Sequence, residues 1–162
     1  MQTLARQAIF AMLMVGSFLW AHSASAQAAD PLVGTWKLDV AKSKFSPGPA
    51  PKSITVTFEA AGEGIKVTAD VVGADDKPTH TTYTGNYDGK DYPIAGSETG
   101  ADTVSLKRVD ARTTVRTDKK GGKVVMTFTR KVSSDGKMLT VTIKGTNPKG
   151  QPVTNVVMLA KQ

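Results

Sequence analysis

Two arginines, Arg108 and Arg130, carry the chemistry that the sequence suggests most directly. Each falls in phase, at a period of two, with the apolar residues of its own stretch: Val104 and Leu106 for Arg108, and Val124, Met126 and Phe128 for Arg130. Alternate residues of a strand point to the same face, so both guanidinium groups are expected to lean toward an apolar interior. A buried cation needs a partner, and the anionic group of a ligand would serve. The alternative is that both arginines lie at a rim and reach water or an acid such as Asp110.

A second polar group surrounds His80, with Tyr83, Tyr87 and Tyr92 nearby. We predict that His80 and Tyr83 donate hydrogen bonds to a ligand; packing at strand ends is the alternative. His80 is the only histidine after residue 26 and the chain has no cysteine, so no zinc site is expected. Nor does His80 stand beside a serine or aspartate in a catalytic motif. The sequence therefore predicts a protein that is not an enzyme, with no catalytic residue, no metal and no cofactor.

Basic residues concentrate between Lys107 and Lys131. Lys107, Arg116 and Lys131 are expected to share an outer face across neighbouring strands, where they could bind lipid head groups or polysaccharide. A solvated surface that protects strand edges is the alternative. Aromatic residues are not interleaved with these charges, so single-stranded nucleic acid is not an expected partner.

The elements that must position these residues are strands. Apolar residues alternate with threonine or charge along most of the chain after residue 53, and no later stretch shows a helical period. Gly- and Asp-rich turns recur every ten to fifteen residues or so, which leaves no room for crossover helices, so strands must pair with sequence neighbours as hairpins. The sequence predicts an all-β, antiparallel up-and-down barrel of eight to ten strands, favoured over a sandwich because closure removes exposed edges. The one interruption is the proline-rich stretch 41–52, with a short helical turn before it.

The first 26 residues have the three parts of a cleavable signal peptide. Arg6 supplies a positive start, an uncharged apolar run follows, and Ala24-Ser25-Ala26 is a small-residue cleavage site. The apolar run is too short to span a bilayer, which needs about 20 residues. We therefore expect residues 27–162 to be one domain, released into the periplasm or secreted. Cleavage removes one basic residue, which lowers the net charge from +7 to +6.

The opening strand, Gly34-Thr35-Trp36-Lys37-Leu38, resembles that of the calycin superfamily of lipocalins and fatty-acid-binding proteins. The turn Asp135-Gly136-Lys137 between two late strands is also similar to that of the fatty-acid-binding branch, and small exported bacterial lipocalin-like proteins share the opening strand and the proline-rich segment. The resemblance implies a lipocalin-like barrel in which Gly34 and Trp36 are structural, with Trp36 packed across the closed end. It also matches Arg130 to a ligand-binding arginine.

The sequence departs from that branch in two places. The proline-rich stretch 41–52 stands where two lid helices would be, and Val157 and Leu159 stand where an Arg-x-Tyr would grip a carboxylate. The resemblance thus implies a cavity, with fatty acid weakened as its particular ligand. The predicted function is that of an exported, monomeric binding protein that holds a small hydrophobic or amphipathic molecule. Binding of anionic surfaces through the basic segment is the alternative.

Overall fold

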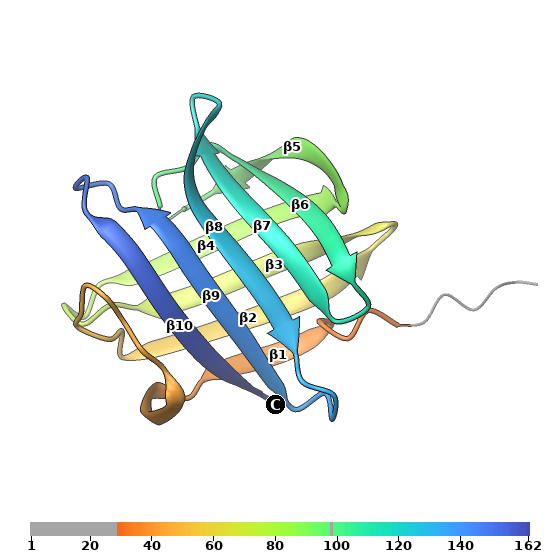
Figure 1. Ribbon diagram of the computed structural model, residues 1–162, viewed down its shortest axis with the longest axis horizontal. Helices are drawn as coiled ribbons and strands as arrows, with labels where there is room; N and C mark the ends of the chain where they lie inside the picture. The colour runs from red at the N-terminus through yellow and green to blue at the C-terminus, as the bar shows by residue number, and fades with distance from the viewer. Residues whose placement is uncertain (1–28, 98) are drawn as a thin grey trace, which may run out of the picture.

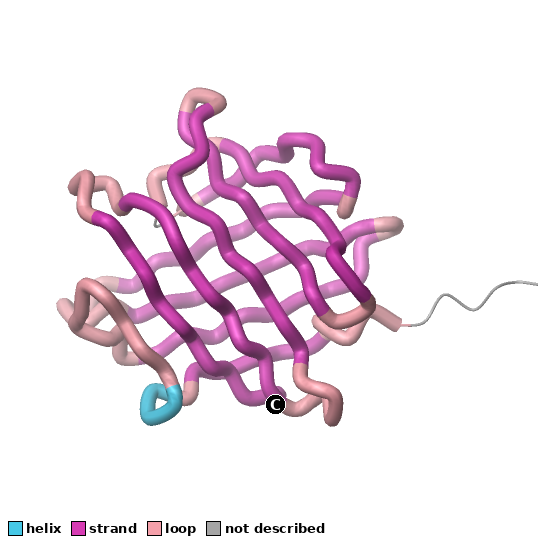
Figure 2. Tube along the Cα trace, viewed as in Figure 1, coloured by secondary structure: helices cyan, strands magenta, loops and turns pink. Residues whose placement is uncertain are grey.

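The computed structural model describes residues 29–97 and 99–162, so the predicted signal peptide lies outside the described residues. These residues form ten strands and one 3-10 helix of three residues, η1 (Figures 1 and 2). The elements in chain order are β1 Gly34–Leu38, η1 Val40–Lys42, β2 Ser53–Ala61, β3 Gly64–Val72, β4 Pro78–Asn86, β5 Asp88–Ala95, β6 Thr103–Asp110, β7 Thr113–Lys120, β8 Lys123–Val132, β9 Met138–Thr146 and β10 Pro152–Lys161. No helix in the described ranges is long and apolar enough to cross a membrane.

The ten strands close into one antiparallel up-and-down barrel. Each strand pairs with its sequence neighbour, and β1 pairs with β10 to complete the ring. In Figure 1, strands β7 to β10 pass in front of β2 to β4 and cross them, with the interior between the two layers. This confirms the predicted lipocalin-like barrel at the upper end of the expected strand count. Closure leaves no free edge at the ends of the sheet, as the barrel prediction required.

The turns behave as their residues predict. Gly121 and Gly122, between β7 and β8, have φ of +53° and +76°. Positive φ at both central residues is typical of a type I′ turn, whose twist matches that of the strands that it joins. A side chain at either position would be strained in this conformation. The glycine pair therefore fixes the register of the hairpin that carries Arg116, Asp118 and Arg130.

The proline-rich connection does more than join two strands. The predicted helical turn is η1, which follows β1. Lys44 then pairs with Val156 of β10 through two backbone hydrogen bonds of 2.7 and 2.8 Å, and Ser46 accepts another from Thr154 at 2.8 Å. Because β1 is only five residues long, the connection continues its edge along β10. The segment closes this part of the wall where the resembled family would carry helices.

The end of the barrel at which β1 begins is filled by side chains, and we call it the closed end. Leu32, Trp36, Ile65 and Val132 are each at most 1% exposed there. The Trp36 indole also donates to the Leu32 carbonyl at 2.8 Å, which ties the segment before β1 across the base. Each fully buried aliphatic side chain contributes about 1.5–3 kcal/mol. The closed end is therefore a compact core, with Trp36 in the structural position that the resemblance implied.

Gly34 also has a structural role at this end. Its φ is +129°, and a Cβ there would lie 2.9 Å from Cε of Lys161. That lysine places its ammonium 5.1 Å from the centre of the Trp36 ring system, a cation–π contact. The lysine end could shift to make room for a side chain, but a φ of +129° strains any residue other than glycine, so the first strand needs glycine here.

Candidate functional site

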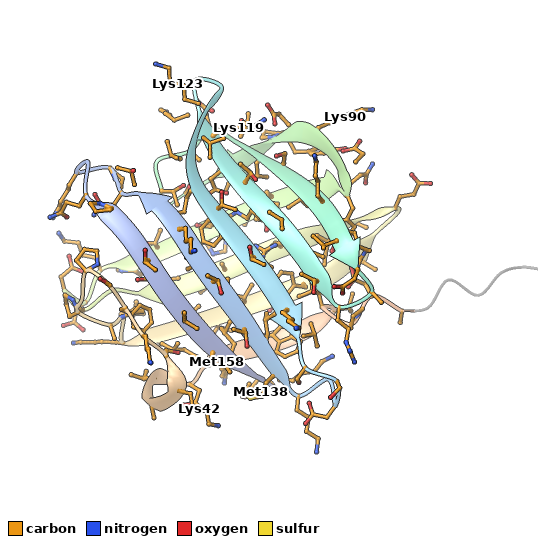
Figure 3. The ribbon with its side chains drawn as sticks, in the orientation of Figure 1. Lys42, Lys90, Lys119, Lys123, Met138 and Met158 are labelled. Atoms are coloured by element: carbon orange, nitrogen blue, oxygen red, sulfur yellow. The ribbon has the colours of Figure 1, made fainter. Side chains whose placement is uncertain are left out.

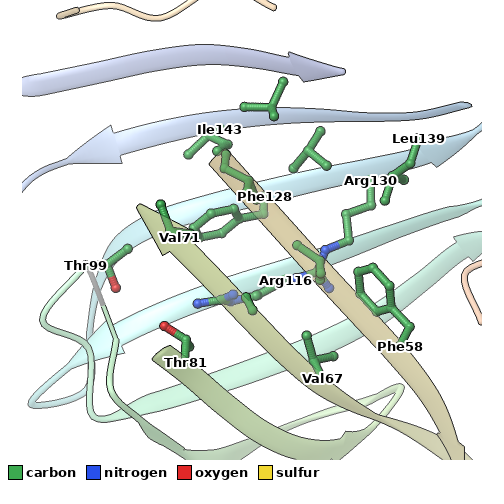
Figure 4. A pocket seen from close by; sticks show the side chains of 15 residues that line it. Phe58, Val67, Val71, Thr81, Thr99, Arg116, Phe128, Arg130, Leu139 and Ile143 are labelled. Atoms are coloured by element: carbon green, nitrogen blue, oxygen red, sulfur yellow. The ribbon is translucent and has the colours of Figure 1, made fainter. Parts of the chain in front are cut away.

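Above the closed end the barrel encloses a cavity of about 120 Å³, measured as space open to the centre of a water molecule (Figure 4). One part of its wall is apolar and comes mainly from β2, β3 and β9. The apolar residues of this part are Ile54, Val56, Val67, Ala69, Val71, Leu139, Val141 and Ile143. The opposite part carries the polar groups of Thr81, Thr99, Arg116 and Arg130, beside the rings of Phe58 and Phe128. One side of the cavity is thus apolar and the opposite side is polar.

Arg130 points into this cavity, as its phase on β8 predicted. The residue is 4% exposed, and its Nη2 donates to the Tyr83 hydroxyl at 2.7 Å. Its guanidinium carbon lies 5.2 Å from the centre of the Phe58 ring. Within the described residues the guanidinium makes no ion pair with a carboxylate. A buried cation with most of its five N–H donors unused is costly unless an anion joins it.

Two hydroxyls lie beside Arg130. Tyr83 is 4% exposed and accepts the hydrogen bond from Arg130, so its own proton is free to be donated. Thr114 is the cross-strand partner of Arg130 in the β7–β8 ladder and is 1% exposed. Its hydroxyl oxygen has no hydrogen-bond partner among the described residues. We call the guanidinium and the two hydroxyls the Arg130 cluster, and Arg130 is the member of it that lines the cavity.

A second arginine, Arg116, also lines the cavity, but it is neutralised. Its Nε and Nη2 donate to the two carboxylate oxygens of Asp118 at 2.5 and 2.6 Å. The Thr99 hydroxyl donates to the same carboxylate at 2.8 Å. The Arg116 guanidinium carbon lies 4.4 Å from the centre of the Phe128 ring. Burial alone lowers the pKa of Arg116, while Tyr83 and Asp118 raise it, and the net pKa is above the usual value.

The prediction placed Arg116 on the outer face with Lys107 and Lys131, and this was wrong. On β7 the inward positions are Thr114, Arg116 and Asp118, whereas Val115 faces out. The strand therefore inverts the usual alternation of apolar-in and polar-out residues. The sequence of β7 contains one apolar residue, Val115, and this residue alternates with the three inward polar ones. A single apolar residue was too little to show which face of the strand is buried.

Arg108 does not enter the cavity: it is exposed at the rim of the closed end, as the alternative prediction stated. It forms an ion pair with Asp30 and stacks 4.1 Å from the centre of the Tyr87 ring. The Tyr87 hydroxyl donates to the same Asp30 carboxylate at 2.8 Å. Burial, followed by the hydrogen bond to Asp30, raises the pKa of Tyr87. Arg108 is absent from the cavity lining, and its partner is Asp30 rather than Asp110.

His80 lies outside the barrel, not at the cavity. It is directly opposite Asp70 in the β3–β4 ladder, its Nδ1 is 2.6 Å from that carboxylate, and both side chains are 62% exposed. The next residue, Thr81, faces the cavity instead and donates to the Gly96 carbonyl at 2.8 Å. The predicted ligand contact of His80 is therefore not one that this geometry allows, because the strand's alternation turns its ring outward.

The basic segment is partly neutralised by neighbours. Lys119 pairs with Asp91 at 2.6 Å and Lys120 with Asp102 at 3.8 Å. Lys123 extends from the tip of the β7–β8 hairpin, away from the barrel (Figure 3). Val124 was expected to face inward but is 61% exposed, because a bulge opposite Asp118 and Lys119 shifts the register before Met126.

No group of three or more His, Asp or Glu side chains in the described part of the chain could hold a metal ion. The polar groups that line the cavity are guanidinium and hydroxyl groups, which bind and orient an anion through hydrogen bonds. The chemistry that this arrangement provides is therefore recognition of a small molecule with a negative group and an apolar body.

No protein-family model matches the sequence, and no curated protein is significantly similar to it. Among solved structures, the chain is similar to the siderocalin Ex-FABP, described as functioning through dual ligand specificities. The two are 10% identical with a TM-score of 0.38, over 82% of this chain and 74% of that chain. The assignment of an antiparallel up-and-down barrel rests on the ten paired strands of this chain.

Proposed function

We propose that this protein is a non-enzymatic carrier that holds a small amphipathic monoanion, such as a carboxylate, inside its barrel. The observation that supports this most strongly is the Arg130 cluster: a guanidinium that is 4% exposed, with no carboxylate partner among the described residues, facing a hollow. Tyr83 and Thr114 lie behind the guanidinium, outside the cavity lining, so Arg130 is the member of the cluster that meets the hollow. An oxyanion with two oxygens would accept from two N–H groups of this guanidinium, and charge-assisted hydrogen bonds of this kind are about twice as strong as neutral ones.

The cavity also limits the size of the ligand and the shape of its apolar part. Pockets for drug-sized ligands have volumes of roughly 300–1,000 Å³, and the present space of about 120 Å³ favours something smaller. The apolar wall on β2, β3 and β9 suits a short alkyl chain or a single ring. Phe58 and Phe128 flank the guanidinium groups and shield them from water, which strengthens the interaction with an anion.

The place of action follows from the amino terminus of the sequence. The signal-peptide pattern in residues 1–26 supports export, so the carrier would act in the periplasm or outside the cell as the chain 27–162. A domain of this length builds its own core without disulfides. We therefore propose a monomer that takes up its ligand after export.

Calorimetry with two matched probes tests the proposal. Octanoate and 1-octanol have the same chain length and differ in the negative group. The mature protein should bind octanoate at least tenfold more tightly than 1-octanol, and native mass spectrometry of protein purified from its own host should reveal the natural ligand. Arg130→Gln should weaken octanoate binding by about 10- to 150-fold, from the 1.5–3 kcal/mol of a charged hydrogen bond.

The matched control is Arg112→Gln, which changes an exposed arginine on the β6–β7 turn and should leave octanoate binding unchanged. Equal affinity for octanoate and 1-octanol would refute an anion-binding cavity. So would an Arg130→Gln variant that remains folded and binds octanoate as the parent protein does.

A further inference from the structure

The Arg116–Asp118 pair is unusually well buried for two charged side chains. The side chains are 8% and 0% exposed, and both carboxylate oxygens are used by the arginine. Both residues lie on β7 and point to the same face, two positions apart. Arg116 lines the cavity, whereas Asp118 lies behind it, toward Thr99. The carboxylate therefore acts on the cavity through Arg116.

The charges inside the barrel can be counted from these contacts. Asp118 cancels Arg116, and at the closed end Asp30 cancels Arg108. Among the described inward-facing residues, Arg130 is left as one positive charge without a counter-charge. A ligand with one negative charge balances it. A second negative charge would be buried without a partner, which is costly in a medium of low dielectric constant.

We infer that Asp118 sets the charge selectivity of the barrel and restricts it to monoanions. This inference depends on the proposed function, in which Arg130 holds the anionic group. Without the carboxylate, Arg116 would present a second guanidinium to the cavity, a diagonal neighbour of Arg130 across the β7–β8 ladder. Two guanidinium groups would favour a dianion. Asp118 is a specificity-determining residue that does not itself contact the ligand.

The geometry also explains why Asp118 stays turned away from the ligand. One of its oxygens accepts from both Arg116 Nη2 and Thr99 at 2.6 and 2.8 Å, and the other accepts from Arg116 Nε. With both oxygens occupied, the carboxylate has no free position from which to repel a monoanion at Arg130. It removes one positive charge from the site without adding a negative one to the cavity surface.

Two probes that differ by one carboxylate test the inference. Octanoate is a monoanion, and hexylmalonate is the same eight-carbon chain with a second carboxylate on the carbon next to the first. By calorimetry at pH 7.5, the mature protein should prefer octanoate at least 30-fold. Asp118→Asn should reduce that ratio at least tenfold, mainly through tighter binding of hexylmalonate. The steric demand of the extra carboxylate is the same in every variant, so the change in ratio reports charge.

The double variant Arg116→Gln with Asp118→Asn separates charge from structure. It removes both members of the pair, keeps the net charge of the interior, and should retain the preference for octanoate with an affinity within fivefold of the parent's. If Asp118→Asn does not fold, as judged by circular dichroism, the double variant decides. A loss of octanoate binding beyond about 50-fold would show that Arg116 itself holds the anion and would overturn the inference.

The two proposals fail in different ways. Parent protein that binds neither probe would overturn the proposed function and, with it, this inference. Parent protein that binds octanoate, together with a folded Asp118→Asn variant whose probe ratio is unchanged, would overturn the role of Asp118 alone.

Discussion

Replacement of Thr114 by valine should stabilise the protein and leave its binding of octanoate unchanged. The Thr114 side chain is 1% exposed and its hydroxyl has no partner among the described residues. Burying such a hydroxyl unpaired costs about 1–3 kcal/mol, and valine has nearly the same shape without that cost. The ligand-free variant should therefore gain about 1–3 kcal/mol in the free energy of unfolding.

The same residue is the ladder partner of Arg130, but it is not among the residues that line the cavity. Its replacement by valine should therefore leave octanoate binding unchanged, because the anion meets the Arg130 guanidinium and not this hydroxyl. A change that raises stability without lowering affinity is the pattern of an unpaired hydroxyl in the wall behind the site. A large loss of affinity would show that the hydroxyl reaches the anion.

The assays are urea unfolding of ligand-free protein and calorimetry with octanoate. The matched control is Thr81→Val, because the Thr81 residue is buried as well but its hydroxyl donates to the Gly96 carbonyl at 2.8 Å. That variant leaves the Gly96 carbonyl without its hydrogen bond and should lose about 0.5–1.5 kcal/mol. If Thr114→Val is instead destabilised as Thr81→Val is, the hydroxyl has a partner in the empty protein and the reasoning fails.

Three further predictions concern the cavity, the outer face and the closed end. Ala69→Trp fills the cavity from the apolar wall and should weaken octanoate binding at least 100-fold in calorimetry. Circular dichroism should show that the β-sheet signal is retained. Unchanged binding would mean that the anion is held elsewhere. Lys119→Glu combined with Lys120→Glu should leave octanoate affinity and its dependence on salt unchanged within twofold, because both lysines lie outside and are paired with acids. A large loss of octanoate affinity would favour the surface-binding alternative. The raised pKa of Tyr87 means that the folded protein holds the phenol proton more tightly than the unfolded chain, so this contribution to stability is complete below pH 10 or so and is lost as the pH rises above it. Tyr87→Phe should therefore show a shallower fall in stability between about pH 10 and pH 11 in urea unfolding; an equally steep fall would show that other groups control alkaline unfolding.

The alternation of residues was enough to predict the barrel and the inward direction of Arg130. Between Met126 and Arg130 the β8 ladder is regular, so a count by twos from the apolar residues gives the right face. The same count failed for Val124, because the bulge lies on the other side of Met126. A bulge is a property of two paired strands, so the pattern of one strand does not reveal it.

The ion-pair and hydrogen-bond partners of the polar residues were harder to predict from the sequence than the faces on which their side chains lie. Arg108 was expected to lean into the barrel, but it lies exposed at the rim of the closed end and pairs with an acid, as the alternative prediction stated. That acid is Asp30, which precedes the first strand and reaches the arginine only because the segment before β1 crosses the closed end. For His80 the strand offers threonine on both faces, Thr81 on the inner face and Thr82 on the outer face among others, so hydrophobicity does not distinguish inside from outside. Only the pairing of β4 with β3 decides which face the imidazole takes.

The division of the barrel into two parts explains why its fold was easier to predict than its site. The closed end contains residues such as Trp36 and Ile65, whose burial stabilises the fold and whose pattern is that of ordinary strands. The cavity places Arg130, with no carboxylate partner in the described residues, and the Arg116–Asp118 pair against a hollow. These groups reduce the stability of the empty barrel, because desolvated charges and unpaired hydroxyls cost free energy. Residues that stabilise the fold are apolar at inward positions, whereas the residues of the proposed site are polar at inward positions. On β7 every inward position is polar, so its sequence gives no sign of a buried strand. We infer that this strand nevertheless carries the charge selectivity of the proposed site.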